Sequence, residues 1–312
     1  MPPARPFRFG ATGSQAASAT EWRHLAQRAE ALGYSTLFLP DHFNDQLAPL
    51  PALAIAAEAT QRLRVGTLVL CNDFKHPAMV AKELATLDLL SDGRVEWGMG
   101  AGWFPFDYES TGISFDGPGT RVDRLTEAVG VMKGLFSGQP VEFDGDHYSI
   151  HGLAGTPNPA QRPHPPLLVG AARKRMLTLA GREADIVGVA PSSDSRPLGA
   201  RPPLMSVTES TDRQLGWIRS AAGSRFDDIE LQAVAFPASV GGDVDQQVDN
   251  LSRAFGIDSS EVRASPHILV GSVDGICELL EERRERWGIS YWVVAAAALE
   301  TFAPVVERMN GR

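Results

Sequence analysis

The chain has 312 residues, 43% of them hydrophobic, which is enough to bury a sizeable core in one large domain or two smaller ones. Its 29 Lys and Arg residues against 38 Asp and Glu residues give a net charge of −9, which disfavours binding nucleic acid or anionic lipid through bulk charge. The cysteines Cys71 and Cys277 are too few for a disulfide framework or a thiolate metal cage.

No apolar run in the sequence reaches the length of a membrane span, and the N-terminal stretch MPPARPFRFG lacks the apolar core of a signal peptide. We therefore expect a reduced, soluble, cytoplasmic protein whose partners include neither nucleic acid nor a membrane. The net charge stays compatible with a small basic pocket for an anionic cofactor.

Short apolar runs alternate with amphipathic helical patterns in the first half of the chain. FRFGATG predicts a first strand, and the capping-box spacing of Ser18 and Glu21 predicts a helix that ends at Gly33. Two further strands, STLFLPD and RVGTLVLC, flank the helix-compatible PALAIAAEATQRL. Pro77 and Gly93 bound the next predicted helix, and the strand VEWGMGA follows it.

The same alternation continues to the end of the chain. A helix is predicted from Arg121 to Phe136, then the strand PPLLVGA, the helix RKRMLTLAGREA and the strand DIVGVA. The strand IELQAVAFPASV, helices near 243–255 and 272–287, the strand YWVVAAAA and a helix near 299–309 complete the series. Eight strands that are apolar on both faces and separated by helices favour a (β/α)₈ TIM barrel with insertions. An open doubly wound sheet is the alternative.

We expect one domain over residues 1–312, interrupted by two insertions. Residues 141–166 form a connecting insertion rich in Gly, Pro and His, with a hairpin in VEFDGDHYSIHG. Residues 191–225 contain several prolines and then a helix predicted from Thr211, with Gln214 as its capping partner. Long insertions are typical of lids and binding loops, so a lid over 191–225 is the favoured interpretation and a disordered loop the alternative.

Gly98, Gly100 and Gly102 alternate at the end of a predicted strand, where glycine costs backbone entropy. Barrel enzymes place their active groups at the carboxyl ends of the strands, and here those ends carry mostly small residues. A barrel opening that is lined by small residues suits a flat ligand that packs against the backbone. We therefore expect the glycines to leave room for a ligand.

Polar candidates at the strand ends are few. His42 suits proton transfer because histidine titrates near neutral pH, although Asp41 as a turn residue and His42 as a bystander are the alternative. Trp103 follows the glycine run and is expected to line a pocket. The segment 170–172 precedes a helix that begins at Arg173. The two interpretations are an anion-binding site at the amino terminus of this helix and an ordinary helix start.

Two further patterns predict structure more than chemistry. His147 and His151 lie in a strand-like segment without a carboxylate cluster, and no H-E-x-x-H occurs, so no metal site is expected. The run EERRER at 281–286 predicts a solvated helix face. Trp287 and Trp292 are expected in the core.

Six segments carry motifs, in order along nearly the whole chain. They are AEALGYSTLFLPDHF, RLRVGTLVLCNDFKHPAMVAKELATLDLLSDGRVEWGMGAGW, DYESTGISFD, PNPAQRPHPPLLVGA, EADIVGV and SPHILVGSVDGICELLEERRERWGISYWVV. The patterns HP-x(4)-AKE-x-ATLD-x-LS-x-GR and P-x-Q-x-P-x-PP-LLVG are the specific parts. With these motifs the chain resembles the bacterial luciferase-like monooxygenase superfamily, and within it the oxidoreductases that depend on deazaflavin coenzyme F420.

The resemblance implies a barrel with the tricyclic ring of the cofactor at its C-terminal mouth. Asp41 and His42 would lie beside the ring, and a non-prolyl cis peptide, by position Leu68–Val69, would back it. The other cofactor-binding residues that the resemblance implies are Ala101, Gly102, Gly170, Ala171, Ala172 and Val189.

One position departs from the family pattern. In the sugar-phosphate dehydrogenases of this group a glutamate that acts as an acid follows the fourth-strand glycine, whereas this chain has Trp103 there. We therefore expect an apolar or aromatic substrate in place of a sugar phosphate. The expected substrate-binding residues are Trp103, Phe104 and Asn72.

The resemblance implies hydride transfer between the deazaflavin and a small unsaturated or carbonyl substrate, with His42, oriented by Asp41, transferring the proton. The main alternative is an FMN-dependent monooxygenase that uses molecular oxygen and a separate reductase. A barrel that only binds its ligand, without catalysis, is a third interpretation. Relatives of this kind are often dimers, so a homodimer is expected.

Overall fold

The computed structural model of the protein describes residues 5–191 and 208–312. The parallel strands follow one another in the order β3-β2-β1-β13-β10-β9-β8-β5-β4, and β5 also pairs with β3, so the sheet closes on itself. Their bounds are β1 (Arg8–Thr12), β2 (Thr36–Leu39), β3 (Arg64–Thr67), β4 (Leu70–Cys71), β5 (Val95–Gly100), β8 (Leu167–Ala171), β9 (Ile186–Val189), β10 (Glu230–Ala235) and β13 (Ile289–Ala295). Because β3 and β4 pair with β5 one after the other, they act as one interrupted strand. The predicted (β/α)₈ barrel is confirmed.

Helices separate the strands as the sequence predicts. They are α1 (Ala19–Ala31), α2 (Pro49–Glu58), α3 (Pro77–Leu90), α4 (Pro105–Thr111), α5 (Pro118–Phe136), α6 (Lys174–Glu183), α7 (Thr208–Ala222), α8 (Val244–Phe255), α9 (Ser259–Ala264), α10 (Val273–Trp287) and α11 (Leu299–Met309). Short 3₁₀ turns are η1 (Asn72–Phe74), η2 (Gly223–Asp228) and η3 (Ala296–Ala298). None of the helices in the described ranges is both long and apolar enough to cross a membrane.

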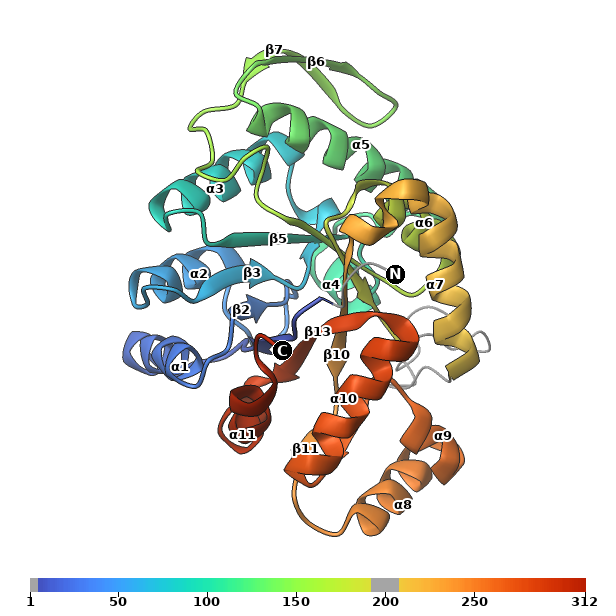
Figure 1. The fold of residues 1–312 in the computed structure, drawn as a ribbon. Helices are drawn as coiled ribbons and strands as arrows, with labels where there is room; N and C mark the ends of the chain where they lie inside the picture. Colours follow the sequence, from blue (N-terminus) through green and yellow to red (C-terminus); the bar gives the residue numbers. More distant parts are fainter. Residues whose placement is uncertain (1–4, 192–207) are drawn as a thin grey trace. The chain divides into compact units, whose positions relative to one another are not determined.

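The chain divides into two compact units, one of residues 14–27 and 37–170 and the other of residues 1–13, 28–36 and 171–312. In the first unit α3 packs beside α5, and the hairpin of β6 (Pro140–Asp144) and β7 (Ser149–Ala154) lies next to α5 (Figure 1). The antiparallel pairing of β6 and β7 confirms the hairpin predicted in the connecting insertion. The Ser18 cap is also confirmed, because the Glu21 N–H donates to Ser18 Oγ at 3.2 Å.

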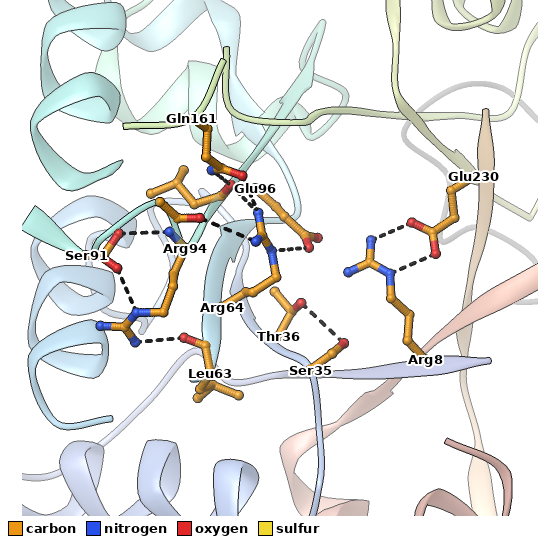
Figure 2. A network of polar contacts seen from close by, with 12 residues as sticks. Arg8, Ser35, Thr36, Leu63, Arg64, Ser91, Arg94, Glu96, Gln161 and Glu230 are labelled. Atoms are coloured by element: carbon orange, nitrogen blue, oxygen red, sulfur yellow. Dashed lines mark hydrogen bonds and ion pairs between the residues drawn. The ribbon is translucent and has the colours of Figure 1, made fainter. Parts of the chain in front are cut away.

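Gln161, in the P-x-Q-x-P motif, fastens the connecting insertion to the amino-terminal ends of two strands. Its side chain donates to Asp88 Oδ1 at 2.6 Å and accepts from Arg64 Nη2 at 3.0 Å. Arg64 also donates to Glu96 Oε1 at 2.7 Å (Figure 2). Arg64 begins β3 and Glu96 lies near the start of β5, so this network lies opposite the carboxyl ends of both strands. In a barrel that end serves stability rather than catalysis.

The second unit has its own core along β1, β10 and β13. Tyr291 and Trp292 of β13 are fully buried, which confirms Trp292 as a core residue. Arg8 forms a bidentate pair with Glu230 (Figure 2). Its guanidinium also lies 3.5 Å from the Tyr291 ring centroid. A smaller apolar cluster joins α8 and α9 to β12 (Leu269–Gly271), which pairs with β11 (Ala238–Val240).

The predicted solvated face at 281–286 is wrong at Arg283, which is only 3% exposed. Helix α10 buries Ile276, Leu280 and Trp287, and Arg283 falls on the same stripe at helical spacing. Its guanidinium carbon lies 5.7 Å from the Trp292 ring centroid. Burial lowers the pKa of Arg283 to about 10. Within the described part of the chain its Nη1 and Nη2 have no hydrogen-bond partner.

Candidate functional site

The interruption between β3 and β4 lies at the predicted position. The peptide bond between Leu68 and Val69 is cis, which confirms the expectation drawn from the family resemblance. The Leu68 N–H donates to the carbonyl oxygen of Leu39, at the end of β2, at 2.8 Å. The third strand of the barrel therefore forms a bulge beside the residues that follow β2.

Gly98 and Gly100 leave room for this bulge. A Cβ on Gly98 would lie 2.0 Å from the Thr67 carbonyl oxygen, and one on Gly100 would lie 2.7 Å from Val69 Cγ2. We expected these glycines to leave room for a ligand. That interpretation needs correction, because the third strand of the protein itself takes the space beside both of them.

Gly102 makes room for Tyr108 on α4. The Tyr108 hydroxyl donates to Asp73 Oδ2 at 3.0 Å and lies 3.3 Å from Cys71 Sγ. Arg124 of α5 donates to the other Asp73 oxygen at 2.7 Å. Burial raises the pKa of the Cys71 thiol to about 12, so the thiol stays protonated at neutral pH. This hydrogen-bond network stabilises the segment that follows β4. Its protonated thiol does not serve as a nucleophile.

His42 is held by a carboxylate from a distant part of the chain. Its Nδ1 lies 2.7 Å from Asp107 Oδ2, and Asp107 Oδ1 accepts the backbone N–H of Phe43 at 2.9 Å. The Asp107 side chain is 3% exposed, whereas that of His42 is 22% exposed. Gln46 donates to the His42 carbonyl at 2.8 Å and so fixes the loop. The imidazole is thus fixed on one side and accessible on the other.

The expectation that Asp41 orients His42 is wrong. Asp41 Oδ2 instead accepts the backbone N–H of Cys71, two residues after the cis peptide, at 3.1 Å. Burial raises the pKa of the Asp41 carboxyl, and the Cys71 N–H partly offsets that rise. Sequence reasoning missed Asp107, which is 65 positions away from His42. No local spacing signals that pairing.

Aromatic side chains lie against the accessible imidazole. The His42 ring meets Trp103 and Phe104 edge to face, with centroid distances of 5.7 and 5.6 Å. Phe104 also contacts Phe106 at 5.8 Å. Trp103 is 43% exposed and Phe106 is 47% exposed. The structure therefore brings two of the expected substrate-binding residues to His42 on an exposed apolar wall.

Asn72, the third expected substrate-binding residue, is already engaged. Its amide donates to the Tyr148 hydroxyl at 3.1 Å, and the residue is only 3% exposed. Tyr148 stacks edge to face with His76, which accepts the Ala78 N–H at the start of α3. The two remaining expected residues of this segment, Ala101 and Gly102, are partly exposed.

The second unit contains Ala171, Ala172 and Val189, three of the residues that the resemblance assigns to the cofactor. Ala171 ends β8 and its carbonyl accepts the Ala190 N–H at 2.9 Å, while Val189 is buried. Gln214 donates to the carbonyls of Ala172 and Ala190 at 3.0 and 3.1 Å. Because α7 begins at Thr208, Gln214 lies inside the helix and is no capping residue for Thr211.

The start of α6 suits an anion. No side chain caps the helix at Arg173, and Lys174 and Arg175 follow directly. Uncapped amides at a helix amino terminus, with cations beside them, favour a phosphate. Gly170 belongs to the other unit, where it lies close to Val69. Among residues 5–191 and 208–312 no group of three or more His, Cys, Asp or Glu is placed to hold a metal ion.

Comparison with known proteins finds relatives that use two different cofactors. The chain is 31% identical over 189 residues to an F420-dependent glucose-6-phosphate dehydrogenase of Microbacterium testaceum, covering 58% of this chain and 55% of that protein. It is 29% identical over 214 residues to the oxygenase component of a flavin-dependent trigonelline monooxygenase of Acinetobacter baylyi, covering 67% and 55%. The chain spans about half the length of these curated relatives.

The fold has close neighbours among solved structures. The coenzyme F420 dependent tetrahydromethanopterin reductase of Methanopyrus kandleri superposes with a TM-score of 0.78 at 21% identity, over 98% of this chain and 100% of that one. At this identity the likeness concerns the fold alone. A family model described as luciferase-like monooxygenase matches residues 4–226, which is more than half of the chain. The chain therefore belongs to the luciferase-like monooxygenase family.

Proposed function

We propose that this protein is an oxidoreductase that transfers a hydride between coenzyme F420 and a small apolar, unsaturated or carbonyl substrate. The observation that carries the proposal is the imidazole of His42, fixed by buried Asp107 at 2.7 Å and flanked by Trp103 and Phe104. Relatives named as F420-dependent dehydrogenases support the choice of cofactor.

Taken separately, each part of the chain fits the portion of the cofactor that the resemblance assigns to it. In the unit with His42, the cis peptide at Leu68–Val69 and partly exposed Ala101 suit a flat ring against backbone. In the other unit, the uncapped start of α6 after Ala172 suits a phosphate. When bound, the deazaflavin supplies or accepts a hydride at its C5 carbon.

The protein's own contribution is to place the substrate and to move a proton. Asp107 occupies the Nδ1 side of His42, so the Nε2 atom is the one that faces a ligand. Nε2 can accept a proton from a hydroxyl or return it to a carbonyl oxygen as hydride moves. Trp103 and Phe104 would cover the reacting groups and exclude water.

The substrate class follows from the same wall. Trp103 stands where the sugar-phosphate dehydrogenases of this group have an acidic residue, and its exposed face offers no hydrogen bond acceptor. Binding of an apolar or aromatic substrate is favoured because it buries the exposed rings of Trp103 and Phe106. We therefore propose a substrate other than glucose 6-phosphate, although a relative is named for that sugar.

The second candidate is an FMN-dependent monooxygenase with a separate reductase, and the trigonelline monooxygenase relative favours it. In this candidate His42 would keep its role in proton transfer, and the uncapped start of α6 would suit the FMN phosphate. The two candidates differ in cofactor and in the need for oxygen. A homodimer stays a prediction for either.

Titration of the purified protein with F420 and, separately, with FMN tests the proposal, with tryptophan fluorescence as the signal. We expect tighter binding and deeper quenching with F420. Trp103→Phe should lose much of the quenching while it keeps the affinity, because Trp103 contacts His42. Preference for FMN would favour the monooxygenase, and binding of neither cofactor would contradict both candidates.

A further inference from the structure

The His42–Asp107 contact determines more than the position of the ring. Asp107 uses both carboxylate oxygens: Oδ2 at 2.7 Å from His42 Nδ1, and Oδ1 as acceptor of the Phe43 N–H at 2.9 Å. A carboxylate can only accept hydrogen bonds. The proton of a neutral His42 must therefore be on Nδ1, which leaves Nε2 as a bare acceptor.

Helix α4 fixes Asp107 itself. The Asp107 N–H donates to the Phe104 carbonyl at 3.1 Å, and Thr111 Oγ1 donates to the Asp107 carbonyl at 2.6 Å. The side chain is almost fully buried, so water does not compete for the carboxylate. The short segment 103–107 thus supplies both the aromatic wall and the anion beside His42.

We propose that Asp107 is the positioning residue of the site and sets the tautomer of His42. This inference rests on the proposed function, in which His42 Nε2 exchanges a proton with the substrate. Asp107 does not touch the reacting atoms. Its role is to keep Nε2 of the neutral imidazole unprotonated, so that Nε2 can take the proton of an alcohol. In the reverse direction the imidazolium beside the Asp107 carboxylate returns that proton from Nε2.

The variant Asp107→Asn makes the sharpest test because it keeps the shape of the side chain and replaces one acceptor oxygen by an NH₂ donor. The Phe43 N–H still needs an acceptor, so the introduced amide oxygen stays with Phe43 and the amide NH₂ faces His42 Nδ1. Nδ1 must then accept, and the proton moves to Nε2. The expected result is an inverted tautomer and a kcat lowered about 10²–10⁴-fold, with a much smaller change in KM.

Long-range ¹H–¹⁵N spectra of histidine-labelled protein report the tautomer directly. The resonances of His42 are those that disappear from the spectrum of His42→Gln. Glu109→Gln is the matched control, since Glu109 is exposed on the same helix and should alter neither the spectrum nor kcat. Asp107→Glu keeps an acceptor-only group, so it should retain the wild-type tautomer and recover part of kcat. If Asp107→Asn does not fold, Asp107→Glu still tests whether an acceptor-only group keeps the wild-type tautomer of His42.

Two results would overturn the inference: an unchanged His42 tautomer in Asp107→Asn, or an inverted tautomer with wild-type kcat. Failure of the proposed function gives a different signature. If His42→Gln turns over as fast as the wild type, proton transfer by His42 is wrong whatever the spectra show. The spectra need no turnover, so the tautomer assignment is decided even then.

Discussion

A Cβ atom on Gly102 would lie 1.8 Å from the hydroxyl oxygen of Tyr108. Gly102 also has a φ of +74°, which side chains disfavour. Gly112 has nearly the same φ, +76°, but nothing within 4 Å of its Cβ position. Alanine at Gly102 and at Gly112 therefore separates two energetic costs: that of a side chain at positive φ and that of a steric clash with Tyr108.

We expect Gly112→Ala to lower the free energy of unfolding by about 1 kcal/mol, the usual cost of an alanine at positive φ. Gly102→Ala should cost about 2 kcal/mol more, because the Tyr108 hydroxyl must leave Asp73. Urea unfolding of both variants measures the difference. Equal losses of stability would contradict the role of Gly102 as space for Tyr108.

Asp41 gives a prediction for the pH dependence of stability. Burial raises the pKa of its carboxyl above the ordinary value of 3.8. Its contribution to stability is therefore full below about pH 3.8 and is lost as pH rises through the raised pKa. Asp41→Asn does not titrate and can still accept the Cys71 N–H.

The stability of Asp41→Asn relative to the wild type should therefore increase from acid to neutral pH. Unfolding of the cofactor-free protein at several pH values measures this difference. A difference that is constant with pH would show that Asp41 is not destabilised in its ionised form.

His267 should make the protein sensitive to acid. It is fully buried, and burial lowers its pKa from 6.5 to about 4, against the raising effect of its hydrogen bond to the Val234 carbonyl. The unfolded chain then takes up the proton first, so stability is complete above about pH 6.5 and falls as pH drops towards 4. The full loss amounts to about 3 kcal/mol.

The matched variant is His267→Asn, whose amide N–H can replace Nδ1–H toward Val234 but does not titrate. Its stability should fall less than that of the wild type between about pH 6.5 and pH 4. Parallel acid unfolding curves would contradict this account of His267.

Arg283 should destabilise the fold in which it is buried. A buried guanidinium whose terminal nitrogens lack partners within the described ranges costs more than an apolar side chain of similar length. We expect Arg283→Met to raise the free energy of unfolding by about 1 kcal/mol or more. Arg286→Met, on the exposed side of α10, is the control and should change stability little. Destabilisation by Arg283→Met would show that the guanidinium has a favourable role.

The parts that the sequence predicts well are those set by local patterns. Strand and helix periodicity predicted the barrel, and the capping spacing of Ser18 predicted the start of α1 within one residue. The cis peptide at Leu68–Val69 came from the family resemblance, since no local spacing specifies it.

The errors at His42 and Gln214 concern contacts between distant segments. Asp107 reaches His42, and Gln214 reaches the carbonyls beside β8 and β9. These contacts depend on how helices dock on strands, which local spacing does not encode. The error at Arg283 is different, because the spacing of Ile276, Leu280 and Trp287 places it on the buried stripe of α10 within a strongly charged run. One domain over 1–312 and a lid over 191–225 stay predictions, and residues 192–207 of that insertion lie outside the described ranges.

The central claim is that His42 serves an F420-dependent hydride transfer. The most direct measurement is the loss of reduced F420 under anaerobic conditions, with a panel of apolar unsaturated and carbonyl substrates, for the wild type and for His42→Ala. We predict turnover by the wild type without oxygen, a rate about 10²–10⁴-fold lower for His42→Ala, and nearly unchanged cofactor affinity. Turnover that requires reduced FMN and oxygen, or an unimpaired His42→Ala, would contradict the claim.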